Sequence, residues 1–402
     1  METMKFLFLS TFYPPNHVGG DAVHAQRLAE ELVNRGHEVH VISQLDCYIR
    51  KKRGEPIIET RRNGVILHQL RSPISHLYPI AVTVSGRPIG LETRLKNIMN
   101  EISPDIVHHQ SPEGFGPWSF RIKGKKTVYT AHDYWSICPC VDFLKFNNEL
   151  CLEKKSCTLC QIQQPRPPQL WRIRHSIIDD LNEIDLVIAP SRFMQKTLIE
   201  NGLRIKTEVV QTFIQDPKPS FDNQETVYRQ MLFVGRIEKS KGLDLLLKGF
   251  AIISQHDSDL RLVIVGEGPM KEEFRNLGKK LGIEDKIDWS GWISEQELIN
   301  EYKKTIVTVL PSTWFENSPS VAIESLAYGT PIMGADIGGI PEMVRQVDHR
   351  LLFKKFDPND FAEKYLSIRD ELVNLRKRAR QIFLESYTQE RAVDKYISAI
   401  SN

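Results

Sequence analysis

Short apolar segments alternate with helical segments along most of the chain, and this alternation limits the possible folds more than any other feature. The first apolar run, 5–10, leads through a loop rich in proline and glycine into a helix expected from about Asp21 to Gly36. Similar runs follow at 38–42, 106–108, 127–130 and 186–189, with helices expected at 91–101, 168–184 and 192–201. Parallel strands need crossover connections, so this order indicates an α/β fold with helices packed on parallel sheets.

The pattern stops at 213–228, where proline, aspartate and asparagine accumulate, and then begins again. Strands are expected at 231–235, 260–265, 306–310 and 331–333, and helices near 243–255, 270–281, 295–304 and 319–328. A chain of 402 residues is also too long for one ordinary core. We therefore predict two doubly wound, Rossmann-like domains, 1–212 and 229–385, that face a shared cleft. A final helix, 386–402, is expected to return to the first domain.

Composition and charge narrow the class of protein. The hydrophobic content of 41% and charged content of 26% are those of a globular protein. The net charge of +2 divides into +5 for residues 1–212 and −3 for the rest, which is too small an excess to indicate nucleic-acid binding. The basic runs at 50–53 and 123–126 are read as a solvated face, or else as a contact for lipid headgroups or an anionic acceptor. No apolar run approaches the roughly 20 residues of a membrane helix, so we expect a cytoplasmic protein, or one peripheral to the inner face of the plasma membrane.

Two glutamates surround the start of an expected helix in the second half. Glu316 lies in the preceding loop and Glu324 in the second turn, while Ser318 is expected as N-cap, Pro319 as first helical residue and Gly329 as the end. The free amides at a helix N-terminus bind phosphate. The two carboxylates would then face the sugar and the ribose of one ligand; simple complementation of the positive end of the helix is the alternative.

Three further loops follow expected strands in this half. Arg236 and Lys241 lie in the first and are expected to converge on an anion, since two fixed cations stabilise a pyrophosphate leaving group. The others contain Gly266-Glu267-Gly268 and Gly338-Gly339, where small residues let a ligand approach the backbone.

These motifs resemble those of the GT-B retaining glycosyltransferases of family 4. The Glu-x7-Glu pair, the Gly-Arg-x4-Lys loop and Gly338-Gly339-Ile340-Pro341-Glu342 all match, and the resemblance extends over nearly the whole chain. It implies that Glu316 lies beside the transferred sugar, that Glu324 binds the ribose, that Arg236 and Lys241 hold the diphosphate, and that no metal is required. Because Pro319 lacks an amide N–H, Ser320 and Val321 are expected to supply the backbone contacts to the donor.

The same resemblance assigns roles in the first half. Gly19-Gly20 looks like the glycine loop that approaches the diphosphate, although a plain turn is an alternative. His132 ends an expected strand and is similar to a histidine that contacts the donor sugar. A buried structural histidine is the alternative.

Five of the six cysteines lie between 138 and 160. Cys157 and Cys160 have chelating spacing, and Cys151 with Cys138 or Cys140 would complete a tetrahedral structural zinc site. Unliganded thiols, a disulfide and an iron–sulfur cluster are the other readings.

The sequence thus predicts a glycosyltransferase that moves a sugar from a UDP- or GDP-linked donor to a glycan or lipid-linked acceptor, in surface polysaccharide synthesis. A GT-B-shaped sugar-nucleotide isomerase or sugar phosphorylase is the alternative. A nucleic-acid-binding or scaffold protein built around the cysteines is a third reading.

Overall fold

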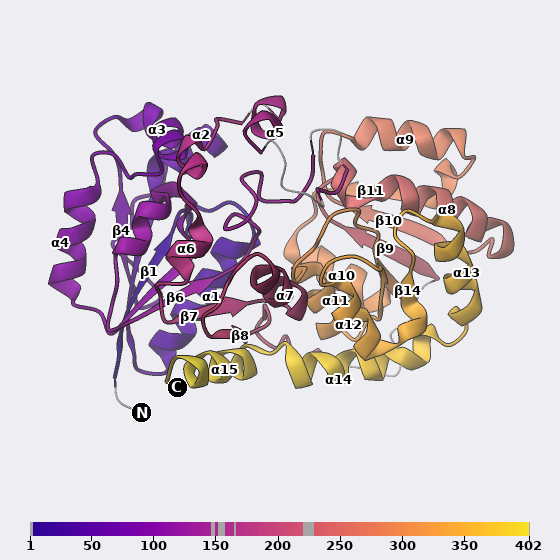
Figure 1. The fold of residues 1–402 in the computed structure, drawn as a ribbon. Helices are drawn as coiled ribbons and strands as arrows, with labels where there is room; N and C mark the ends of the chain where they lie inside the picture. Colours follow the sequence, from indigo (N-terminus) through magenta and orange to yellow (C-terminus); the bar gives the residue numbers. More distant parts are fainter. Residues whose placement is uncertain (1–2, 146–148, 152–156, 165, 220–228, 402) are drawn as a thin grey trace. The chain divides into compact units, whose positions relative to one another are not determined.

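The computed structural model describes residues 3–145, 149–151, 157–164, 166–219 and 229–401. The chain divides into two compact units: unit 1 comprises residues 1–211 and 392–402, and unit 2 comprises residues 212–391. The predicted linker, 213–228, belongs to unit 2 as far as residue 219, and 220–228 lie outside the described residues. Each unit is built on its own sheet (Figure 1).

The sheet of unit 1 has eight strands in the order β3-β4-β2-β1-β5-β6-β7-β8, and only the β3–β4 pair is antiparallel. The strands are β1 (Lys5–Ser10), β2 (Glu38–Gln44), β3 (Arg61–Arg62), β4 (Val65–Leu70), β5 (Ile106–Ser111), β6 (Lys126–Thr130), β7 (Leu186–Ala189) and β8 (Thr207–Val209). Central strands such as β1 are buried residue after residue, because helices cover both faces of a parallel sheet.

The helices of unit 1 are α1 (Gly20–Asn34), α2 (Leu45–Lys52), α3 (Tyr78–Ser85), α4 (Glu92–Ile102), α5 (Cys157–Gln163), α6 (Ile177–Leu181) and α7 (Arg192–Glu200). The last helix, α15 (Gln389–Ser401), enters unit 1 at Ala392. The prediction of one helix over 168–184 was wrong. The chain forms a 3-10 turn, η4 (Leu170–Ile173), and then α6, because Ser176 takes an extended backbone (φ −112°, ψ 130°) that interrupts a continuous helix.

The sheet of unit 2 is parallel throughout, in the order β11-β10-β9-β12-β13-β14. Its strands are β9 (Gln230–Val234), β10 (Arg261–Val265), β11 (Ile287–Gly291), β12 (Val307–Leu310), β13 (Ile332–Ala335) and β14 (Leu352–Phe353). Its helices are α8 (Leu243–His256), α9 (Lys271–Lys280), α10 (Glu295–Lys304), α11 (Ser320–Ala327), α12 (Ile340–Val347), α13 (Pro358–Ile368) and α14 (Arg376–Ser386).

Both sheets change direction of winding beside their first strand. In unit 1 the chain proceeds from β1 to β2 and β4, then returns to place β5 on the other side of β1. In unit 2 it proceeds from β9 to β10 and β11, then returns to place β12 on the other side of β9. Ligands of open α/β sheets bind at the carboxyl ends of the strands that flank such a switch point. The loops after β1, β5, β9 and β12 are therefore where a site is expected.

Helices of the described chain are too short or too polar to cross a bilayer.

Candidate active site

Two oppositely charged side chains meet at the switch point of unit 2. Lys241 follows β9, at the end of the 3-10 turn η5 (Lys239–Lys241), and Glu316 lies in the loop that follows β12. The Lys241 ammonium donates to Glu316 Oε1 at 2.6 Å, and the carboxylate is almost buried. The structure thus brings together two of the residues that the sequence predicts for one site.

Three donors converge on the same oxygen of Glu316. Besides Lys241, the Ser312 hydroxyl donates to Oε1 at 2.9 Å and the Trp314 indole N–H at 2.8 Å. Burial opposes ionisation, yet the Lys241 ammonium and these hydrogen bonds hold the pKa of Glu316 below its usual value. The carboxylate is therefore ionised at neutral pH and fixed in orientation by Oε1.

Gly338 and Gly339 hold the Glu316 loop from the other side. The Gly339 amide donates to the Glu316 carbonyl at 2.6 Å. A Cβ at Gly339 would overlap the carbonyl oxygen of Asn317, and Gly338 takes φ 62° against the Glu316 backbone. The sequence suggested that these glycines admit a ligand, whereas here they admit the neighbouring loop.

The helix after this loop begins one residue later than the sequence indicated. Pro319, not Ser318, is the N-cap, because its extended ψ of 121° places it outside the helix, and Ser320 is the first helical residue. Gly329 follows the end of the helix with φ 71°. The missing proline N–H therefore falls before the first turn, and the amides of Ser320 and Val321 lie in the turn whose N–H groups have no intrahelical acceptor.

Glu324, in the second turn of α11, is held by a residue that the sequence did not reveal. The hydroxyl of the fully buried Tyr302 donates to Glu324 Oε2 at 3.0 Å. The Tyr302 ring stacks on Tyr328, with 5.9 Å between centroids and 9° between planes. No spacing rule connects Tyr302, in α10, with Glu324. In contrast, Ser312 and Trp314 are polar neighbours of Glu316 in the sequence, and that proximity was an available signal.

Arg236 occupies the predicted loop but does not converge on Glu316 in this structure. Its guanidinium pairs with Glu238 at 3.3 Å, and its side chain is 66% exposed. Of the two cations predicted to converge on this site, only Lys241 lies against Glu316.

In unit 1, the predicted residues lie in the loops after β1 and β6. Gly19 is the N-cap of α1 with φ 90°, a conformation that favours glycine, and Gly20 is the first helical residue. A Cβ at Gly20 would meet no atom of the described chain within 4 Å. His132 packs edge-on against His24 of α1, with 5.0 Å between ring centroids.

His132 ends a hydrogen-bonded series that reaches the C-terminal helix. Its Nε2–H donates to the Gln110 side-chain oxygen at 2.7 Å, and the Gln110 amide donates to His108 Nδ1 at 3.2 Å. His108 Nδ1 also accepts from the Tyr396 hydroxyl at 2.9 Å. Because an amide oxygen only accepts, the proton of His132 is fixed on Nε2. Burial lowers the pKa of His132 to about 4, against the effect of Asp21, so its imidazole is neutral at physiological pH.

The zinc prediction finds no support. All six cysteines are thiols, and within the described ranges no three His, Cys, Asp or Glu side chains are arranged to hold a metal ion, so Cys138, Cys151, Cys157 and Cys160 do not form the expected site. The side chains bond locally instead: Gln164 donates to the Cys160 sulfur at 3.5 Å. A hydrogen bond from the Cys140 thiol is the main cause that lowers the pKa of Cys138 to about 6.

Two doubly wound sheets in one chain are the architecture of the GT-B fold. Residues 18–216 match the model of Glycosyltransferase Family 4, and residues 216–382 match that of Glycosyl transferases group 1. The chain belongs to this family and is a glycosyltransferase that uses a nucleotide-sugar donor. This assignment favours transfer over the isomerase and phosphorylase readings, and it excludes the nucleic-acid-binding and scaffold readings.

Several similar proteins span nearly the full length of the chain. An uncharacterized glycosyltransferase of Methanocaldococcus jannaschii is 26% identical and covers 93% of both chains. An uncharacterized 42.6 kDa protein in the cps region of Klebsiella pneumoniae is 24% identical over 85% of this chain and 88% of its own. Among solved structures, HepE of Anabaena in complex with UDP has a TM-score of 0.67 and 16% identity, over 99% of this chain and 100% of its own. At that identity the likeness shows the fold alone.

Proposed function

We propose that the protein transfers a sugar, with retention of configuration, from a UDP- or GDP-linked donor to a glycan or lipid-linked acceptor in surface polysaccharide synthesis. HepE binds UDP and UDP-glucose, which supports a UDP-linked donor. The relative encoded in a cps region supports a role in capsule-type polysaccharide. The observation that carries the proposal is the buried Glu316 carboxylate, ionised beside Lys241 at the switch point of unit 2.

The donor is proposed to bind along the start of α11. The amides of Ser320 and Val321 and the positive end of the helix face the diphosphate. The Lys241 ammonium has three N–H donors, so it can hold Glu316 and a phosphate oxygen together. Arg236, whose side chain is exposed, adds a second cation when its guanidinium leaves Glu238. Glu324, oriented by Tyr302, accepts hydrogen bonds from the ribose hydroxyls.

The chemistry follows from a leaving group that is stabilised as it departs. The bond from the sugar C1 to the diphosphate oxygen breaks, and the acceptor oxygen forms its bond to C1 on the same face. The departing diphosphate accepts the proton of the acceptor hydroxyl. Lys241, Arg236 and the α11 amides offset the charge that develops on the diphosphate. Glu316 and His132 orient the hydroxyls of the transferred sugar, and Gly19 and Gly20 allow the diphosphate to approach the backbone. The charge of these groups serves in place of a metal ion, so we expect activity to persist in EDTA.

Peripheral membrane contact through unit 1 is proposed for a lipid-linked acceptor at the cytoplasmic face. The basic run 50–53, at the end of α2, is exposed. Leu77, at the end of the 3-10 turn η1 (Ser75–Leu77), and Ile80, in the adjoining α3, are 65% and 37% exposed. Apolar side chains beside basic ones are typical of surfaces that bind anionic lipid.

Donor hydrolysis gives a test that needs no knowledge of the acceptor. We expect one member of a panel of UDP- and GDP-sugars to be hydrolysed slowly, with nucleotide release followed by chromatography and the product anomer by NMR. Glu316→Gln keeps the size of the side chain and should lower the rate by about 100-fold or more. Glu385→Gln, an exchange at a half-exposed residue of α14, is the matched control. Hydrolysis that survives Glu316→Gln would remove Glu316 from the mechanism. Conversion of the donor without nucleotide release would indicate an isomerase instead.

A further inference from the structure

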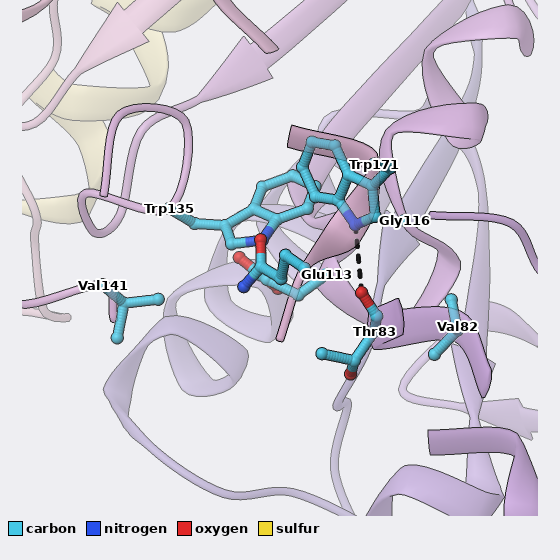
Figure 2. Close-up of a pocket in the computed structure, with 8 residues that line it drawn as sticks. Val82, Thr83, Glu113, Gly116, Trp135, Val141 and Trp171 are labelled. Carbon is cyan, nitrogen blue, oxygen red and sulfur yellow. Dashed lines mark hydrogen bonds between the residues drawn. The ribbon is translucent and has the colours of Figure 1, made fainter. Parts of the chain in front are cut away.

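Unit 1 contains a pocket of about 130 Å³ that the mechanism above does not use. It is lined by Val82, Thr83, Glu113, Gly116, Trp135, Val141, Gln169 and Trp171 (Figure 2). These residues come from α3, the segment that follows β5, the loop after β6 and η4. The loops at the carboxyl ends of β5 and β6 thus contribute to its wall.

Two indoles form one side of the pocket and are held firmly. Trp135 and Trp171 lie edge to face, with ring centroids 6.3 Å apart. The Trp171 N–H donates to the Thr83 carbonyl at 3.0 Å, so this indole offers only its apolar surface (Figure 2). The Arg172 guanidinium lies over Trp171, 4.5 Å from its centroid, and donates to the Trp135 carbonyl and, at 2.6 Å, to Gln169 Oε1.

Gly86 provides the space for Trp171, and Gly116 provides the space for the Gly86 backbone. A Cβ at Gly86 would lie 2.9 Å from the Trp171 ring, and one at Gly116 would lie 2.5 Å from the Gly86 carbonyl oxygen. Both glycines have positive φ, 70° and 66°. Neither position therefore accepts a larger side chain, and the place of the indole depends on glycine at Gly86.

The charge of the pocket disfavours anions. Its lining includes the Glu113 carboxyl and neither lysine nor arginine, and the Arg172 guanidinium behind Trp171 is already bonded to the Trp135 carbonyl and Gln169 Oε1. Burial, with the nearby Asp133 and Asp21 carboxylates, raises the pKa of Glu113 well above its usual value. A neutral carboxyl group both donates and accepts a hydrogen bond, as does each hydroxyl of a sugar. The pocket is thus suited to an uncharged ligand that is rich in hydroxyl groups.

Size and shape further restrict the ligand. A cavity of roughly 150 Å³ accommodates benzene, so a pocket of this volume admits one six-membered ring and no more. A pyranose ring presents C–H groups on its face and hydroxyls at its edge, which matches apolar indoles on one side and a carboxyl group on another.

We propose that this pocket binds one uncharged sugar ring of the acceptor, with Trp135 and Trp171 against its C–H face and the Glu113 carboxyl bonded to its hydroxyls. That the bound sugar belongs to the acceptor rests on the proposed transferase function. That the pocket binds a sugar ring rests on the pocket alone. The acceptor end is accordingly a glycan residue, and a charged phosphate or carboxylate group is excluded from this pocket.

Saturation-transfer NMR on the full chain tests ring binding directly. The probes are the methyl glycosides of glucose, galactose, mannose and N-acetylglucosamine, and mannitol serves as an open-chain polyol with hydroxyls but no ring face. At least one glycoside should receive saturation through its ring C–H protons, with a millimolar Kd, and mannitol should receive none. Trp171→Ala should weaken binding by about tenfold. Trp292→Ala, at an indole 86% exposed in unit 2, should leave it unchanged.

Glu113→Leu is the second variant, since it keeps the approximate size of the side chain but removes both the hydrogen-bond donor and the acceptor of the neutral carboxyl group. It should also weaken glycoside binding, and circular dichroism checks the fold of both variants. Absence of saturation in every wild-type glycoside sample would overturn the proposal. Equal saturation of mannitol, or glycoside binding retained in both Trp171→Ala and Glu113→Leu, would overturn it as well.

Donor hydrolysis separates this proposal from the proposed function. Hydrolysis without acceptor depends on the unit 2 site, so Trp171→Ala should retain it while losing transfer to a glycoside. A wild-type protein that binds a glycoside but hydrolyses no nucleotide sugar would contradict the transferase function and leave the sugar-ring pocket intact. A wild-type protein that hydrolyses a nucleotide sugar but binds no glycoside would contradict the sugar-ring pocket and leave the transferase function intact.

Discussion

At the scale of single residues, the site depends on how one carboxylate oxygen is satisfied. Lys241, Ser312 and Trp314 all donate to Glu316 Oε1, at 2.6, 2.9 and 2.8 Å. A buried carboxylate stays ionised only when hydrogen bonds and opposite charge replace its lost hydration. Removal of any one donor should therefore change both the orientation and the acidity of Glu316.

Trp314→Phe keeps the ring and deletes one hydrogen bond to Glu316. A hydrogen bond to a charged group contributes roughly 1.5–3 kcal/mol, so we expect donor hydrolysis to fall about tenfold or more. The pKa of Glu316 lies below its usual value and should rise when this hydrogen bond is lost, which moves the acid limb of the rate–pH profile to higher pH. Rate measurements from pH 4 to 8 check this, with Trp292→Phe as control. An unchanged acid limb would mean that Trp314 does not act on the carboxylate.

At this scale the sequence predicts the residues of the site but not the side chains that hold them in place. Glu316 was predicted from the helix start that follows it and Lys241 from a loop that follows a strand, and the family motifs joined them in one site; the winding of the sheet makes β9 and β12 neighbours. Tyr302 reaches Glu324 from another helix, and the Arg236 guanidinium turns to Glu238. Both depend on side-chain directions that spacing does not encode. The cysteine spacing suggested zinc, yet the thiols bond locally.

At the scale of elements, the Glu316 site is held by two loops of unit 2 that pack against one another. Gly338 and Gly339, ahead of α12, lie against the backbone of Glu316 and Asn317, ahead of α11. Strands with continuous apolar runs, such as β1 and β9, were predicted correctly from the sequence. The edge strand β11, with the sequence Ile-Asp-Trp-Ser-Gly, was missed because its apolar–polar alternation covers only four residues and the strand is only partly buried.

Gly339→Ala tests the contact between these loops. Its Cβ would overlap the Asn317 carbonyl oxygen, so the Glu316 loop must move, at a cost of about 1–3 kcal/mol. We expect a lower melting temperature and a reduced rate of donor hydrolysis, measured by calorimetry and nucleotide release. Gly54→Ala is the control, because a Cβ there meets nothing within 4 Å among the described atoms. Equal melting temperatures for the two variants would show that the loops adjust without strain.

At the scale of the whole molecule, the chain leaves unit 1 after Gln211 and re-enters it at Ala392. The returning helix α15 buries Val393, Tyr396 and Ile400 in unit 1. Tyr396 stacks on His108, with 5.3 Å between centroids, and bonds to it through its hydroxyl. Unit 1 therefore completes its core only when the last residues of the chain are present, whereas unit 2 is continuous in sequence.

Tyr396→Ala should consequently weaken unit 1 and leave unit 2 unaffected. Loss of a fully buried aromatic side chain costs about 3–5 kcal/mol, whereas Tyr396→Phe loses only the hydroxyl bond, at about 1 kcal/mol. Hydrogen exchange followed by mass spectrometry should show faster exchange in β1 and β5 and no change in β9 and β12, because each unit has its own sheet and opens separately. Ser398→Ala, on the exposed side of α15, is the control. Faster exchange in β9 and β12 to the same degree would show that the two units open as one. The packing of α15 in unit 1 would then govern the stability of the donor site as well.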